Sequence, residues 1–209
     1  MVEGTKRHLW VAGTLGHEGH YIIKPFKTDK FNSIFQKYYI TCKEVVTASK
    51  FLTMFQVDNH HLAQAVKWLT EKQGHPALYS GQMFQLESMV NRQDSISQTP
   101  TGSGKSYAGL CLPDILLFLR NQLGYVTISD QPRVLYIVPL VAIMESLEEQ
   151  LVKLDISYQF LRAGTTSFVN DKVKVVIISP EKLTEKETLA SVTNLDWSAI
   201  VLDEGRFQL

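Results

Sequence analysis

Apolar residues recur in two alternating patterns along most of the chain. Short, nearly continuous apolar runs predict buried strands, and longer segments with apolar positions three and four residues apart predict helices. The expected strands are 94–99, 134–138, 173–178 and 200–202, and the expected helices are 59–73, 82–90, 105–123 and 141–154. Strands that alternate with helices predict an α/β fold, in which a parallel sheet is covered by helices on both faces.

The alternation begins near Pro76, and the residues before it are harder to interpret. Their clearest element is the helix 59–73, which Gly74 is expected to end. We therefore divide the chain into a small, mainly helical N-terminal appendage of unknown role, residues 1–75, and an α/β domain, residues 76–209. One expected strand of this domain, 94–99, contains a single strong hydrophobe, so we expect it to be short or poorly packed.

Length and composition narrow the class of protein. The chain has 209 residues, of which 44% are hydrophobic, so it can bury a sizeable core. Its formal net charge is zero, which excludes a strongly basic tail as the main contact with nucleic acid but does not exclude local basic patches. Cys42 and Cys111 stand far apart and lack metal-ligand spacing, so we expect neither a disulfide scaffold nor a zinc site, and an intracellular, reducing compartment. No apolar run is long enough to span a bilayer and no signal peptide is visible, so we expect no membrane partner.

Residues 99–106 carry the strongest chemical signal. They read Thr-Pro-Thr-Gly-Ser-Gly-Lys-Ser and fit the nucleotide-binding P-loop pattern, except that Thr99 replaces the usual first glycine. In such a loop, backbone N–H groups surround phosphate oxygens, the lysine adds a positive charge, and the serine hydroxyl can ligate Mg²⁺. The helix that follows points the positive end of its dipole at the same anion. The predicted nucleotide-binding residues here are Thr101, Gly102, Ser103, Gly104, Lys105 and Ser106.

A second motif lies near the C-terminus. Residues 199–204 form an apolar run that ends in two acids, as in a Walker B strand. Asp203 is expected to hold Mg²⁺, partly through water, and Glu204 is expected to orient or deprotonate the attacking water. With a P-loop upstream, this interpretation is favoured over an ordinary strand that runs into an acidic turn. We therefore expect ATP and Mg²⁺ as cofactors, and Lys105, Asp203 and Glu204 as catalytic residues.

The order of these motifs resembles the first motor domain of superfamily 2 helicases, and most closely that of RecQ-like DNA helicases, over residues 76–206. Gln82 stands before Lys105 at the spacing of the adenine-reading glutamine of that family. The segments that look like its motif I, motif Ia, the next segment and the DEAH position are 100–106, 138–144, 178–183 and 202–206. The resemblance implies a RecA-like P-loop NTPase domain.

The resemblance also implies functional residues and partners. Gln82 would read the adenine of ATP, and Pro139 and Leu140 would contact the nucleic-acid backbone. The expected partner is DNA, preferably single-stranded or a tailed duplex. The intact family couples ATP hydrolysis to 3′-to-5′ strand separation, and its members are nuclear in a eukaryote.

Some positions depart from the family pattern. Gly205-Arg206 replaces the Ala-His of the DEAH box, and Tyr79-Ser80 stands where Arg-Pro is common. The sequence ends at Leu209, before a second motor lobe with its arginine finger, so we expect this chain alone not to unwind DNA. Two alternatives stay open: a non-catalytic, nucleotide-dependent nucleic-acid-binding module, and a lobe of a DEAD-box RNA helicase.

Overall fold

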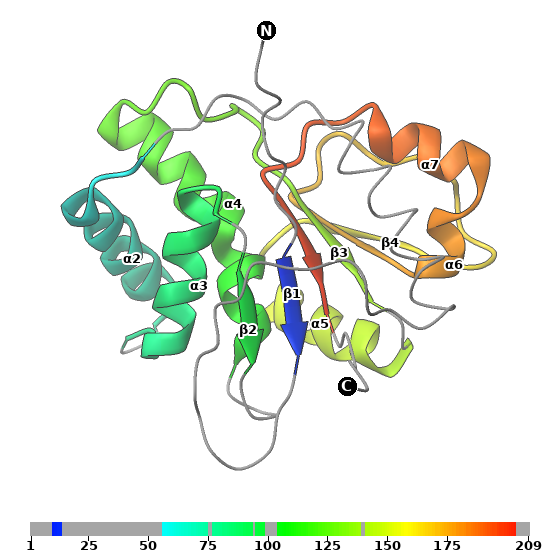
Figure 1. The fold of residues 1–209 in the computed structure, drawn as a ribbon, viewed down its shortest axis with the longest axis horizontal. Coiled ribbons are helices and arrows are strands. Elements are labelled where there is room, and N and C mark those ends of the chain that lie inside the picture. The colour runs from blue at the N-terminus through cyan, green and yellow to red at the C-terminus, as the bar shows by residue number, and fades with distance from the viewer. Residues whose placement is uncertain are drawn as a thin grey trace, which may run out of the picture.

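The computed structural model describes residues 10–13, 56–74, 77–93, 95–98, 104–138 and 141–203. The strands in these ranges are β1 (Trp10–Gly13), β2 (Ile96–Gln98), β3 (Val134–Ile137), β4 (Tyr158–Leu161), β5 (Val175–Ile178) and β6 (Ala199–Leu202). They form one six-stranded sheet in the order β2-β1-β6-β3-β5-β4 (Figure 1). Every pair of neighbouring strands is parallel, so the predicted α/β fold with a parallel sheet is confirmed.

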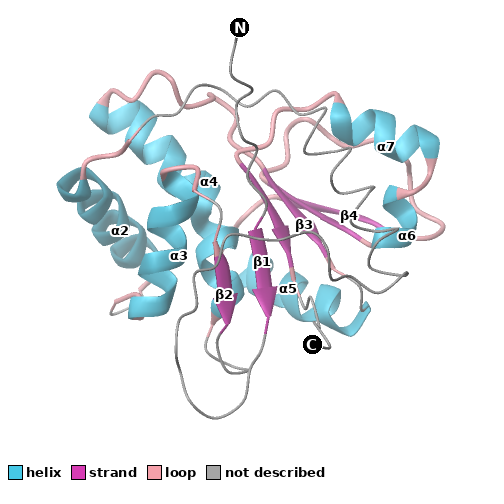
Figure 2. Ribbon diagram, viewed as in Figure 1, coloured by secondary structure: helices cyan, strands magenta, loops and turns pink. Residues whose placement is uncertain are grey.

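Helices cover both faces of the sheet, as predicted. They are α2 (Asn59–Gln73), α3 (Ser80–Val90), α4 (Lys105–Leu123), α5 (Val141–Lys153), α6 (Pro180–Leu183) and α7 (Lys186–Thr193). Figure 2 shows α2, α3 and α4 together at one side of the sheet and α6 and α7 at the other. Successive strand residues point to opposite faces, so the interior divides into two clusters. In β3, Tyr136 belongs to the cluster with α2 to α5, and Leu135 belongs to the cluster with α6 and α7.

Most predicted elements appear within a few residues of their expected bounds. The helix 59–73 is confirmed at both ends, because the side chain of Asp58 accepts from the first-turn amides of His60 and His61 and Gly74 closes the last turn. The expected weak strand is short, since β2 spans three residues. The sequence analysis missed β1, β4, α6 and α7.

Two parts of the predicted N-terminal appendage belong to the same sheet and core as the rest. In β1, Val11 pairs with Ile96 of β2 on one side and with Leu202 of β6 on the other. Helix α2 buries Leu62 and Leu69 in the core that also holds α3, α4 and α5. The appendage is therefore not separate in these two parts, and most of the other residues of 1–75, whose role the sequence left unknown, lie outside the described ranges.

A buried carboxylate joins three elements on the α4 side of the sheet. Asp114 of α4 is 3% exposed, and its two oxygens accept hydrogen bonds from Lys72 Nζ at 2.8 Å and from Lys174 Nζ at 2.6 Å. Burial alone would raise the pKa of Asp114, but the hydrogen bonds and charges of Lys174 and Lys72 lower it below its ordinary value. This ion triad links α2, α4 and the segment before β5.

In the part of the chain that the structure describes, no helix has the length and apolar character that a membrane crossing needs.

Candidate nucleotide site

Three of the predicted site residues meet at one edge of the sheet. Lys105 and Ser106 open α4, shortly after β2 ends, and Asp203 follows directly after β6. Both strands are parallel, so these residues lie at their carboxyl ends, where open α/β sheets bind ligands. Lys105 Nζ is 3.9 Å from Asp203 Oδ1, and Ser106 Oγ donates a hydrogen bond to Asp203 Oδ2 at 3.4 Å. Asp203 and Ser106 are 97 residues apart in the sequence, so the fold itself creates this contact.

The environment of Asp203 is largely closed to water. Its side chain is 3% exposed, and that of Lys105 is 13% exposed. A buried carboxylate is costly unless it is paired, and the ammonium of Lys105 and the hydroxyl of Ser106 supply partners. Both distances are long for such contacts. A ligand could therefore draw Lys105 and Ser106 toward itself at a small cost in lost contacts.

Gln82 connects helix α3 to the end of the P-loop. Its Oε1 accepts a hydrogen bond from the backbone N–H of Tyr79 at 2.9 Å, and its Nε2 donates to the backbone oxygen of Gly104 at 3.0 Å. Gly104 has a φ of 70°, which favours glycine, and a Cβ there would lie 2.5 Å from Gln82 Nε2 and would displace the end of that side chain. The structure thus brings Gln82 to the P-loop, while its reading of adenine stays a prediction.

Several predicted site residues lie outside the described ranges. They are Thr101, Gly102 and Ser103 of the P-loop, Pro139 and Leu140 of the expected nucleic-acid contact, and Glu204. Their roles therefore stay predictions.

The sequence analysis missed Tyr136 of β3. Its hydroxyl donates a hydrogen bond to the backbone oxygen of Ser106 at 2.8 Å, and its ring lies against Gly109 of α4. Two signals could have found this contact: a tyrosine inside an otherwise aliphatic buried run, and a glycine inside a helix.

The donor atoms suit a hard divalent cation that is held jointly with a phosphate ligand. Among the described residues, no group of three or more His, Cys, Asp or Glu side chains could hold a metal ion alone. The carboxylate of Asp203 and the hydroxyl of Ser106 are oxygen ligands of the kind that Mg²⁺ prefers, and protein sites for Mg²⁺ commonly use one or two carboxylates with phosphates and water. These residues therefore fit Mg²⁺ bound together with a nucleotide.

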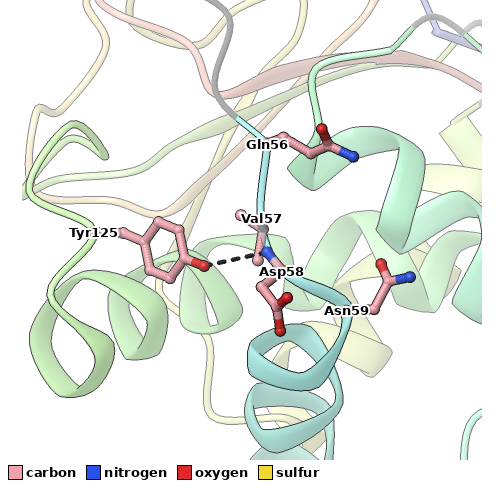
Figure 3. A pocket seen from close by; sticks show the side chains of 5 residues that line it. All are labelled: Gln56, Val57, Asp58, Asn59 and Tyr125. Atoms are coloured by element: carbon pink, nitrogen blue, oxygen red, sulfur yellow. Dashed lines mark hydrogen bonds between the residues drawn. The ribbon is translucent and has the colours of Figure 1, made fainter.

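A hollow elsewhere on the molecule is separate from these residues. It is lined by Gln56, Val57, Asp58, Asn59 and Tyr125, near the first turn of α2 (Figure 3). Tyr125 follows the C-terminal end of α4, whereas Lys105 begins that helix, so the two places are a helix length apart. The Tyr125 hydroxyl accepts from the backbone N–H of Asp58 at 3.2 Å. These contacts account for how α2 is attached to the segment after α4.

The parallel α/β sheet, with Lys105, Ser106 and Asp203 at its carboxyl edge, defines a RecA-like P-loop domain. A comparison with protein families matches residues 79–205 to the DEAD/DEAH box helicase family. Because this match spans more than half of the chain, the protein belongs to the DEAD/DEAH box helicase family. The domain is that of an ATP-dependent nucleic-acid helicase motor, and such helicases use ATP, usually with Mg²⁺. Comparisons with curated proteins and with solved structures gave no match.

Proposed function

We propose that this chain is an ATP-binding motor lobe of a RecQ-like DNA helicase. The observation that carries the proposal is the meeting of Lys105, Ser106 and Asp203 at the carboxyl ends of β2 and β6. The spacing from Gln82 to Lys105 and the segment 138–144 favour the DNA-specific family over DEAD-box RNA helicases.

Different residues of the site would bind different parts of Mg-ATP. The ammonium of Lys105 would leave the carboxylate of Asp203 and face the β- and γ-phosphates. The N-terminus of α4, a helix of 19 residues, would add its partial positive charge at the same place. Ser106 and Asp203 would hold Mg²⁺, which supplies positive charge against the phosphate oxygens. Glu204, which lies outside the described residues, would orient or deprotonate the water that attacks the γ-phosphate.

The charge of Lys105 provides the first test. Lys105→Ala should abolish the binding of Mg-ATP measured by titration calorimetry, while the circular dichroism spectrum stays unchanged. Lys67→Ala is a matched control, because Lys67 is an exposed lysine on α2 with a side chain 77% exposed. Equal affinity for ATP in wild type and Lys105→Ala would contradict the nucleotide site.

Gln82 provides a test of base selection. Its amide can donate and accept at once, as recognition of the adenine edge requires. Wild type should bind ATP more tightly than GTP, and Gln82→Ala should remove this preference. Gln64→Ala, on the exposed face of α2, should preserve it. A wild-type protein that binds both nucleotides equally would rule out this role for Gln82.

The nucleic-acid partner decides between the proposal and its alternatives. Contacts to the phosphate backbone through Pro139 and Leu140 should give weak, sequence-tolerant and salt-sensitive binding to single strands. Fluorescence anisotropy should show tighter binding to single-stranded DNA than to RNA of the same sequence. Tighter binding to RNA would favour a DEAD-box RNA helicase lobe. ATP binding with no hydrolysis, with or without single-stranded DNA, would favour the non-catalytic module.

A further inference from the structure

Tyr136 is a buried polar residue to which the proposed nucleotide chemistry gives no role. It lies within β3, is 1% exposed, and has aliphatic neighbours along the strand. Its side chain crosses from the sheet to the first turn of α4, where the hydroxyl donates to the backbone oxygen of Ser106 at 2.8 Å. The sheet and the end of the P-loop are therefore connected at the residue proposed to ligate Mg²⁺.

Gly109 makes room for this contact. A Cβ at position 109 would overlap the Tyr136 hydroxyl and would lie 3.0 Å from Cζ of the ring. Residues 106 and 109 are three positions apart in α4 and so share one face of the helix. Glycine inside a helix lowers stability relative to alanine, and a buried tyrosine hydroxyl needs a hydrogen-bond partner. Here the two residues together form a single contact to Ser106.

Ile137, the residue after Tyr136 in β3, contacts the backbone of Asp203, the other proposed Mg²⁺ ligand. The backbone N–H of Asp203 donates to the backbone oxygen of Ile137 at 3.1 Å. Strands β3 and β6 pair in register along their whole length, with Tyr136 opposite Val201. Consecutive residues of one strand therefore fix the backbone of Ser106 and the backbone of Asp203.

The hydroxyl of Tyr136 stays protonated in this environment. Burial, followed by the negative charge of Asp203 and the nearby Cys111, raises the pKa of Tyr136 well above its ordinary value. At neutral pH the hydroxyl of Tyr136 therefore keeps its proton and can donate it to the Ser106 carbonyl.

We infer that Tyr136 is a positioning residue, which fixes the first turn of α4 so that Ser106 and Asp203 hold Mg²⁺ together. This inference rests on the proposed nucleotide site. It assigns Tyr136 a specific effect: the gain in ATP affinity that Mg²⁺ provides depends on the hydroxyl, whereas the affinity for ATP without Mg²⁺ does not. A purely structural role would change both affinities by the same factor.

The test is Tyr136→Phe, which removes the hydroxyl and keeps the ring. Titration calorimetry would measure ATP affinity with Mg²⁺ and with EDTA. The gain from Mg²⁺ should fall by about tenfold or more, as when residues that orient metal ligands are replaced. ATP affinity in EDTA should match wild type. Tyr158→Phe is the matched control, since Tyr158 lies on the edge strand β4 and its hydroxyl donates to Glu148 of α5, and it should change neither affinity.

The possible results separate this inference from the proposed function. If wild type binds no ATP, the proposed function is wrong and the inference fails with it. If Ser106→Ala removes the Mg²⁺ gain but Tyr136→Phe retains it, only the role of Tyr136 is wrong. Equal losses in Mg²⁺ and EDTA would also overturn that role. Should Tyr136→Phe fold poorly, Gly109→Ala tests the same contact from α4 and should reduce the same Mg²⁺ gain.

Discussion

Replacing Gly109 by alanine sets two effects of known size against each other. Alanine inside a helix is ordinarily more favourable than glycine by about 1 kcal/mol. On propensity alone, Gly109→Ala in α4 should therefore stabilise the protein by about that amount.

Packing against Tyr136 opposes this gain. The added Cβ would overlap the hydroxyl and would lie 3.0 Å from Cζ and 3.4 Å from Cε2 of the ring. The ring belongs to a strand inside the sheet and is 1% exposed, so it has no open space into which it could move. Overpacking of this kind costs about 1–3 kcal/mol. Displacing the hydroxyl also breaks its hydrogen bond to Ser106, which costs about 0.5–1.5 kcal/mol. The net expectation is a loss of about 0.5–3.5 kcal/mol.

Urea unfolding followed by circular dichroism would measure this difference. Ala63→Gly, on the exposed face of α2, measures the effect of helix propensity alone and should lower the free energy of unfolding by about 1 kcal/mol. In a Tyr136→Phe background the closest overlap is absent, so Gly109→Ala should cost less than it does in wild type. If Gly109→Ala is as stable as wild type or more stable, the close contact between Gly109 and Tyr136 does not exist in solution.

Two further predictions concern the ion triad and the sheet. Asp114→Asn should lower the free energy of unfolding at neutral pH by about 1–3 kcal/mol, less than for a fully buried pair because Lys72 and Lys174 are 42% and 31% exposed. Because the pKa of Asp114 is lowered in the folded protein, its charge stabilises the fold above the unfolded pKa of about 4, and this stabilisation is lost as pH falls through the folded pKa. The difference in unfolding free energy between wild type and Asp114→Asn should therefore shrink as pH falls over that range. A difference that does not change with pH would contradict the ion triad. Val11→Pro removes a backbone donor from β1, which lies between two other strands, and should lower the melting temperature by several degrees more than Val11→Ala, which shortens the side chain but keeps the donor. A Val11→Pro protein as stable as Val11→Ala would mean that β1 does not occupy this place.

The sequence predicted those elements whose local signals agree. Strands β3 and β5 are buried at every position, so an apolar run was enough to find them. Helix α2 was predicted at both ends because Asp58 and Gly74 carry capping chemistry on either side of an amphipathic pattern. In the candidate site, motifs predicted the residue types, and Lys105, Ser106 and Asp203 do lie together.

The missed elements lack such signals. Strand β4 lies at the edge of the sheet, and three of its four residues are only partly buried, so no apolar run marks it. Strand β1 comes from a segment with no clear pattern, and its place depends on pairing with strands far along the chain. The order of the strands in the sheet depends on contacts between segments that are far apart in the sequence. The same is true of the side-chain contacts that Gln82 and Tyr136 make with the start of α4. Local periodicity carries no information about them.

The order of the strands in the sheet separates the P-loop from the motif that ends in Asp203, so the two motifs do not meet through their sequences alone. Lys105 follows β2 and Asp203 follows β6, but β1 lies between these strands. Neighbouring strands are about 4.8 Å apart, so β2 and β6 are separated by about 10 Å. The 3.9 Å contact between Lys105 and Asp203 therefore requires the start of α4 to reach across β1 toward β6. The hydrogen bond from Tyr136 to Ser106 joins the same end of α4 to β3, which lies beyond β6. The motifs supply the phosphate and Mg²⁺ chemistry, and the strand order requires the start of α4 to lie over β1 for the two motifs to meet.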